Sequence, residues 1–223
     1  GLNDRLLRNS GDGEFEDASS WGLIPGGKGL GVLLADLDDD ADTDIYVAND
    51  FRKPDYLYIN NRNGSFSEKL SDYFQHISLS SMGMDINDLN NDGLEDVFVL
   101  DMAIEDPVRQ KRLFVQDLNY DRFALMVKLK LYYQYAHNML QLNTGNHSYS
   151  EIAYYAGVAE TDWSWAPLIA DFDNDGWKDI FVTNGYRRDL TDWDYKEFFV
   201  DSINSRLVKG QKVMIEELYN KIP

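Results

Sequence analysis

The sequence predicts an all-β chain that forms a segment of a β-propeller with helical insertions. An acidic nine-residue motif occurs three times, each copy lying between two short apolar runs, and it starts at Asp36, Asp88 and Asp171. An asparagine followed six residues later by an aromatic residue also occurs three times, at Asn9, Asn60 and Asn143. The two motifs recur at nearly equal spacing, and a period near 50 residues with four short strands per unit is typical of propeller blades.

The order of the motifs assigns the strands. Strands A and B flank each acidic loop, because the neighbouring runs are short and rich in β-branched and aromatic residues. Strands C and D flank each asparagine hairpin, where Asp12-Gly13 and Asn63-Gly64 suit tight turns. The expected units are strands C and D of a preceding blade at 5–19, a blade at 29–71, a blade at 79–155, and strands A and B of a next blade at 164–183.

Residues 1–223 therefore form a single propeller segment of about three blades. Three blades cannot close a ring of four to eight. The remaining blades of a longer chain, or a second copy, are the expected partners, and a longer chain is favoured.

Two stretches depart from the β pattern. A helical insertion is expected at 105–136, with a helix start at Asp106-Pro107 and helix formers over Asp121–Tyr135. A helical segment is expected at 190–223, running from Thr191 to Leu207 and continuing over Gln211–Lys221. We expect these helices to cover a blade edge, which is favoured over a role in ligand binding.

The acidic loops offer oxygen ligands at regular positions. Side-chain oxygens stand at positions 1, 3, 5 and 9: Asp36, Asp38, Asp40 and Asp44; Asp88, Asn90, Asp92 and Asp96; Asp171, Asp173, Asp175 and Asp179. Backbone carbonyls at position 7 belong to Asp42, Leu94 and Trp177. Clustered carboxylates repel one another unless a cation compensates, and Ca²⁺ accepts six to eight such oxygens. We therefore predict Ca²⁺ in each loop.

Two alternatives bear on this prediction. An EF-hand requires a Glu at position 12 and a helix on each side, but position 12 is valine in all three loops, so the EF-hand is excluded. Polar turns that bind nothing remain open, since Asp, Asn and Gly are common turn residues. Gly93 and Gly176 suit the sharp turn, whereas the first loop has Ala41 there and is expected to be strained or differently wound.

Composition narrows the function. With 39 acidic and 21 basic residues, nucleic acid is an unfavourable partner. A hydrophobic fraction of 43% excludes a disordered acidic tail.

The chain has no cysteine, which excludes disulfides and thiolate metal sites. It also has no apolar run of the roughly 20 residues that span a bilayer. Its first residues are not a signal peptide, so any targeting segment is expected to lie outside this sequence.

Catalysis is not predicted. His76, His137 and His147 are dispersed, and no Walker-type or Gly-x-Ser-x-Gly element occurs. The face opposite the acidic loops is instead expected to collect aromatic and charged residues: Trp21, Tyr73, Phe74, Trp163, Trp165, Asp50, Arg52, Asp101, Arg187 and Arg188. Trp165 is expected in the core between blades. The arginines are expected either to clamp a carboxylate or to neutralise Asp189, Asp192 and Asp194.

The loops and hairpins resemble the FG-GAP/VCBS repeat of integrin α-subunit propellers. Residues 46–50, 163–167 and 183–189 resemble more closely bacterial VCBS-repeat proteins of the ASPIC/UnbV-associated, CRTAC1-like group. The resemblance covers about 5–190, and it implies a secreted, periplasmic or cell-surface calcium-binding propeller whose ligands bind opposite the metal. We thus expect a non-enzymatic adhesion or recognition protein for an extracellular protein or glycan; a polysaccharide-binding or polysaccharide-degrading protein is the alternative.

Overall fold

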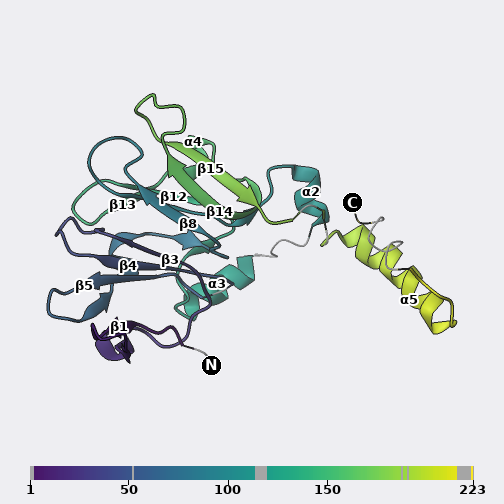
Figure 1. Ribbon diagram of the computed structural model, residues 1–223. Helices are drawn as coiled ribbons and strands as arrows, with labels where there is room; N and C mark the ends of the chain where they lie inside the picture. Colours follow the sequence, from purple (N-terminus) through teal and green to yellow (C-terminus); the bar gives the residue numbers. More distant parts are fainter. Residues whose placement is uncertain are drawn as a thin grey trace.

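The computed structural model describes residues 3–51, 53–113, 120–186, 188–189, 191–214 and 222. The fold is mostly β, as predicted. Small antiparallel sheets lie side by side like the blades of a fan, and short helices occupy their margins (Figure 1). The described residues form no closed ring.

The first four-stranded sheet contains β3 (Gly29–Ala35), β4 (Asp44–Asn49), β5 (Tyr56–Asn60) and β6 (Phe66–Glu68), paired antiparallel in that order. The connection from β3 to β4 is the first acidic loop. The turn from β5 to β6 contains Gly64 at a φ of +79°, a left-handed conformation that glycine adopts without a Cβ clash.

The second four-stranded sheet repeats this order with β8 (Met84–Asn87), β9 (Asp96–Val99), β12 (Met139–Asn143) and β13 (Tyr149–Glu151). Its insertion between β9 and β12 carries β10 (Met102–Ala103), α2 (Pro107–Arg112), α3 (Tyr120–Lys128) and β11 (Gln134–Tyr135). Asp106 caps α2 by accepting hydrogen bonds from the amides of Val108 and Arg109 at 2.7 and 2.9 Å.

The expectation of helix over Asp121–Tyr135 is wrong at its end. The helix α3 stops at Lys128, and Gln134–Tyr135 form β11, which pairs in parallel with β7 (Ile77–Ser78). Lys130 and Tyr132 have φ values of +58° and +68°, which no α-helix accommodates. Pairing with a distant strand therefore overrides the local helix propensity of this segment.

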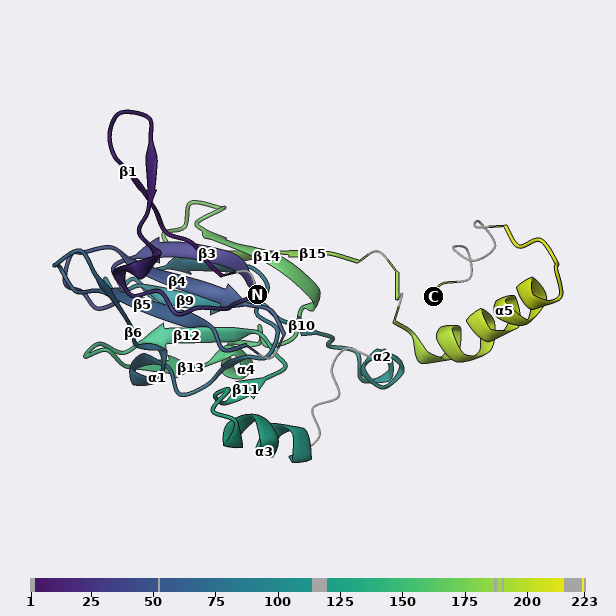
Figure 2. The ribbon, with the colours of Figure 1, turned by 90° about the horizontal axis from the view of Figure 1, so that it is seen from below.

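The third sheet has the order β10, β14 (Asp162–Ala170), β15 (Asp179–Asn184). The short strand β10 from the insertion pairs with the start of β14, an addition that the sequence did not indicate. A separate hairpin, β1 (Leu7–Asn9) and β2 (Phe15–Asp17), projects away from the sheets in Figure 2. Short helical turns complete the body: η1 (Ser19–Trp21), α1 (Leu70–Tyr73) and α4 (Ala153–Ala156).

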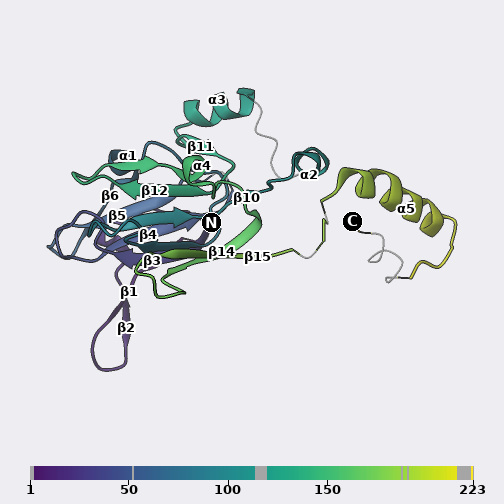
Figure 3. The same ribbon diagram turned by 90° about the horizontal axis from the view of Figure 1, so that it is seen from above.

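The C-terminal part is helical over a shorter span than expected. A π-helical turn, η2 (Tyr195–Val200), leads into α5 (Asp201–Val208), which stands away from the sheets (Figure 3). Residues 211–214 of the further expected helix are not helical, and 215–221 lie outside the described residues.

The apolar core lies between the sheets. Tyr46 and Leu57 of the first sheet pack with Val97 and Met139 of the second, and all four are at most 1% exposed. A second cluster joins the second sheet to β14 and β15, with Phe98, Leu100, Leu140 and Ile169 at its centre. Each sheet thus buries a face against its neighbour, as stacked blades do.

Backbone contacts also join the second and third sheets. The amide of Gly83 donates to the carbonyl of Trp165 at 2.8 Å, and a Cβ at position 83 would lie 2.5 Å from that oxygen. The amide of Ile169 donates to the Asp85 carboxylate at 2.6 Å. Strands β8 and β14 therefore lie close together, and position 83 requires glycine.

A buried carboxylate links the first two sheets. Asp55 accepts hydrogen bonds from the Asn49 amide and from the hydroxyls of Tyr46 and Ser81, at 2.8 to 2.9 Å. Burial raises the pKa of Asp55 to about 7. Since Ser81 precedes β8, this carboxylate holds the connection between the sheets in place.

Candidate metal sites in the acidic loops

The three acidic loops have the same backbone winding. The residue at position 4 has a φ of 60° to 62° in all three: Asp39, Asn91 and Asn174. Position 6 is also left-handed, at +67° for Ala41, +88° for Gly93 and +94° for Gly176. Of the two expectations for the first loop, the strained one is confirmed and the different winding is wrong: Ala41 adopts the glycine conformation, at a cost of roughly 1–2 kcal/mol.

The same backbone amides are held by the same carboxylates in each loop. Position 1 accepts from the amides at positions 5 and 6, and position 5 accepts from the amide at position 7. Position 9 accepts from the amide at position 2, at 2.9 to 3.0 Å. Bonds within the nine residues thus set the conformation of each loop.

Strand C completes the first two loops. The second oxygen of Asp44 accepts the amide of Asn60 at 2.8 Å, and that of Asp96 accepts the amide of Asn143 at 2.8 Å. Each asparagine side chain also donates to the carbonyl at loop position 8. The two sequence motifs therefore meet in one hydrogen-bonded unit, which accounts for their equal spacing.

Carboxylate oxygens converge in two of the loops. Asp36, Asp38 and Asp40 place one oxygen each within 4.8 Å of one another, and so do Asp171, Asp173 and Asp179. In the second loop Asn90 stands at position 3, and its amide group donates to Asp92 at 2.9 Å. Among the described residues, Asp88, Asp92 and Asp96 form no such cluster.

Asp38 carries the clearest electrostatic signal. Its Oδ1 is buried and has no hydrogen-bond partner within the described part of the chain. Burial, with the charges of Asp44 and Asp40, raises the pKa of Asp38 to about 6. Arg62 lies at the rim and pairs with Asp42 at 2.7 Å and Asp40 at 3.2 Å, and it interacts with the charge of Asp38 only at longer range. A buried, unpaired carboxylate oxygen is a strong acceptor site for a cation.

The structure also locates the predicted ligands at position 7 and Asp175 at position 5 of the third loop. The carbonyls of Asp42, Leu94 and Trp177 follow the amides that donate to position 5. Asp175 accepts the amide at position 7, as Asp40 does. It is not among the three aspartates whose oxygens converge in its loop. Metal binding by these residues stays a prediction.

The aromatic face opposite the loops is only partly as expected. Phe74 and Asp101 are buried, and Tyr73 is 8% exposed, so these three belong to the core. Trp165 is 50% exposed on the outer side of β14, so the described sheets do not bury it, and its expected burial between blades stays a prediction. Arg52 and Arg187 lie outside the described residues.

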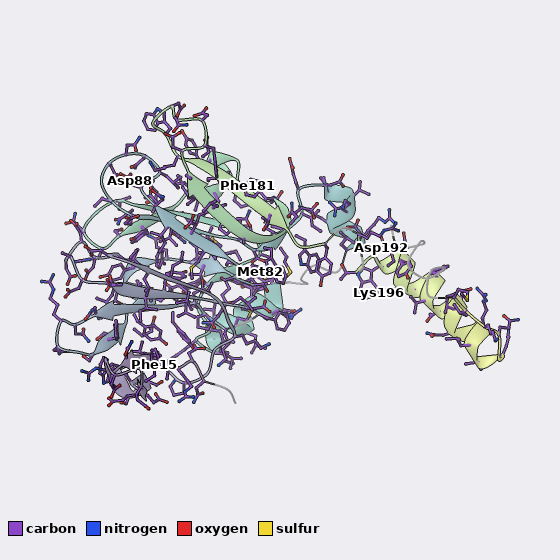
Figure 4. The ribbon with its side chains drawn as sticks, in the orientation of Figure 1. Phe15, Met82, Asp88, Phe181, Asp192 and Lys196 are labelled. Carbon is purple, nitrogen blue, oxygen red and sulfur yellow. The ribbon has the colours of Figure 1, made fainter. Side chains whose placement is uncertain are left out.

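The acids after β15 are held by α2. Arg109 binds Asp189 at 2.7 Å, and Arg112 lies 2.9 Å from Asp192 and 3.6 Å from Asp194. Figure 4 shows Asp192 beside α2, at the start of the C-terminal helical part. Arg188 instead donates to the carbonyl of Ile222. The insertion therefore neutralises these acids, a role that local sequence does not signal.

Comparison with known families agrees with the repeat. The family model of the FG-GAP-like repeat matches residues 2–47, 36–99 and 117–182, which together exceed half of the chain. The chain therefore belongs to the FG-GAP-like repeat family, whose repeats form propeller blades. No curated protein matches the chain.

Proposed function

We propose that the acidic loops bind Ca²⁺ and that the ion stabilises a propeller domain for adhesion or recognition outside the cell. The observation that supports this most is the unpaired, buried oxygen of Asp38 beside Asp36 and Asp40. A bound divalent ion offsets the repulsion in such a cluster and gives that oxygen a partner.

The donors suit Ca²⁺ more than other metals. Every side-chain ligand at the proposed sites is an oxygen, and the loops offer no histidine or thiolate. Five protein ligands per loop leave positions for water in the flexible sphere of Ca²⁺. The ion acts here as a structural element, because it binds the folded loops only.

Calorimetric melting tests this role. Saturating Ca²⁺ at about 100 times its dissociation constant adds about 2.7 kcal/mol per site, so EDTA should lower the Tm and added Ca²⁺ should restore it. Mg²⁺, which demands stricter octahedral geometry, should restore less. An unchanged Tm in EDTA and in Ca²⁺ would refute the proposal.

The partners proposed for this chain are further blades. Leu30, Val32 and Leu34 of β3 are 54 to 64% exposed on the outer side of the first sheet. At the other end, Leu168 and Phe181 are 51% and 56% exposed, and Figure 4 shows Phe181 on the outer sheet. Apolar faces of this kind require cover. We propose blades of a longer chain as that cover, rather than a second copy.

A chain extended by flanking repeats tests this assignment. Protection of the β15 amides from hydrogen exchange should rise in the extended chain, because a new strand would pair with them. A concentration-dependent dimer of residues 1–223 with the same protection would favour a second copy.

Membership in the ASPIC/UnbV-associated, CRTAC1-like group is part of this proposal. FG-GAP repeats are typical of extracellular proteins, which supports a location outside the cell. In the described residues, no helix is both long and apolar enough to cross a membrane. A non-enzymatic role follows from carboxylates used as metal ligands instead of poised acids.

A further inference from the structure

A small hollow lies at the end of the third sheet that is opposite its acidic loop. At this end Ser164 pairs with Asn184, whereas Ala170 and Asp179 meet at the loop end. The hollow has a volume of about 50 Å³, enough for a few waters or one substituent of a ligand. It is lined from α2, from the start of β14 and from the segment after β15 by Arg109, Asp162, Trp163, Tyr186, Arg188, Asp189 and Thr191.

Two donors in this hollow lack acceptors. Nε1 of Trp163 and Oγ1 of Thr191 are buried and form no hydrogen bond within the described residues. A buried polar group without a partner loses its hydrogen bonds to water without replacement, so native proteins rarely leave one. Two such groups in one hollow indicate a ligand that brings hydrogen-bond acceptors.

The charges around the hollow are already paired. Arg109 donates to both oxygens of Asp162 and to both oxygens of Asp189. These bonds lower the pKa of Asp162, so the carboxylate stays ionised. The second guanidinium of the hollow, Arg188, donates to the carbonyl of Ile222, so two carboxylates balance two guanidiniums that already have protein acceptors. An anionic ligand would meet both carboxylates, while a cation would offer no acceptor to Trp163 or Thr191. The hollow therefore suits a neutral ligand.

Aromatic rings flank the hollow on its open side. Trp163 and Tyr186 stack edge to face with ring centroids 4.6 Å apart, and Tyr186 is 47% exposed. A groove of about 400 Å³ continues from Tyr186 past Asn184 to the exposed Trp165. A second groove of about 590 Å³ runs from Asp162 and Arg109 towards Tyr154. Aromatic surfaces beside carboxylates and amides match the apolar faces and hydroxyls of sugar rings.

We propose that this surface binds a neutral saccharide chain, one substituent of which enters the hollow and accepts hydrogen bonds from Trp163 and Thr191. Its hydroxyls donate to the free lone pairs of Asp162 and Asp189, and its rings lie along Tyr186. The site deepens the recognition role proposed above, but it does not depend on Ca²⁺.

Isothermal titration with cellotriose, mannotriose and N-acetylchitotriose tests the proposal. At least one should bind, and Trp163→Phe, which keeps an aromatic ring but removes the N–H, should weaken binding about tenfold, the equivalent of one lost hydrogen bond. Thr191→Val should weaken it similarly. Trp21→Phe, in a tryptophan far from the site, is the matched control and should bind as the unaltered protein does.

The outcomes separate this site from the metal proposal. Absence of binding across the three sugars, or binding that both variants retain, would overturn the saccharide site. Preferential binding of trigalacturonate or of trilysine would overturn it in favour of a charged ligand. Melting of each variant in Ca²⁺ and EDTA shows folding independently, so loss of the calcium response with intact sugar binding would refute only the metal proposal.

Discussion

The acidic loops at 36–44 and 171–179 share a winding and an internal hydrogen-bond pattern but lie in different surroundings. Asp44 is fully buried, whereas Asp179 at the same loop position is exposed. Leu37, at position 2, is 1% exposed, but Phe172 at that position is 52% exposed. Nine residues therefore suffice to shape the loop, but not to bury it.

Neighbouring strands make the difference. The first loop receives the Asn60 amide from strand β5, and the Tyr149 hydroxyl of the next sheet donates to the carbonyl of Leu37 at 3.3 Å. Within the described residues, no strand pairs with the outer edge of β15, and no amide beyond the third loop reaches Asp179. The first acidic loop is thus completed by its own blade and by the next one.

The largest expected effect comes from the position-9 aspartates. Asp44→Ala leaves the buried amide of Leu37 and the partly buried amide of Asn60 without acceptors, so we expect about 2–4 kcal/mol of destabilisation. Asp179→Ala frees one amide at an exposed position and should cost less than about 1 kcal/mol. Urea unfolding in EDTA measures both without metal effects. Equal losses would show that the surroundings of the two loops do not matter.

The position-3 aspartates separate metal binding from folding. Asp38→Asn removes a charge that burial disfavours, so the metal-free protein should gain up to about 1 kcal/mol after solvent screening is allowed for. The same variant should lose part of the stabilisation by Ca²⁺ in that loop, about 1 kcal/mol, because an amide oxygen, which Asn90 supplies at this position of the second loop, carries no charge to attract the ion. Melting curves with EDTA and with Ca²⁺ give both values.

Asp173→Asn is the matched variant in the exposed loop. Because Asp173 is exposed, its change should leave the metal-free Tm where it was and only weaken the Ca²⁺ response of the third loop. A metal-free gain as large as that of Asp38→Asn would contradict the role assigned to burial.

The smallest expected effect concerns position 6. Ala41→Gly should stabilise the protein by about 0.5–1 kcal/mol, because glycine accepts the left-handed backbone while adding some chain entropy to the unfolded state. Gly176→Ala should destabilise by about 1 kcal/mol, since it meets no atom but places a Cβ at a φ of +94°. Chemical denaturation checks the pair, and shifts of the same sign would show that the two loops are wound differently.

Part of the fold could be predicted from the sequence. The mostly-β fold and the repeat came from apolar runs and from two motifs at matching spacing. The common winding of the three loops was not predicted, because Ala41 replaces glycine in the first; it arises because Asp36, Asp88 and Asp171 bond to amides only four and five residues away. The end of α3 and the exposure of Trp165 were not predictable, since each depends on which distant strand lies alongside.

Sequence alone determined how the acidic loops are wound, because every bond that shapes them closes within nine residues. Tertiary structure alone decided which of these aspartates is buried and where Arg109 meets Asp162 and Asp189, 53 and 80 residues away. Burial and long-range ion pairs depend on neighbours that the order of the sheets supplies. A local pattern does not encode that order.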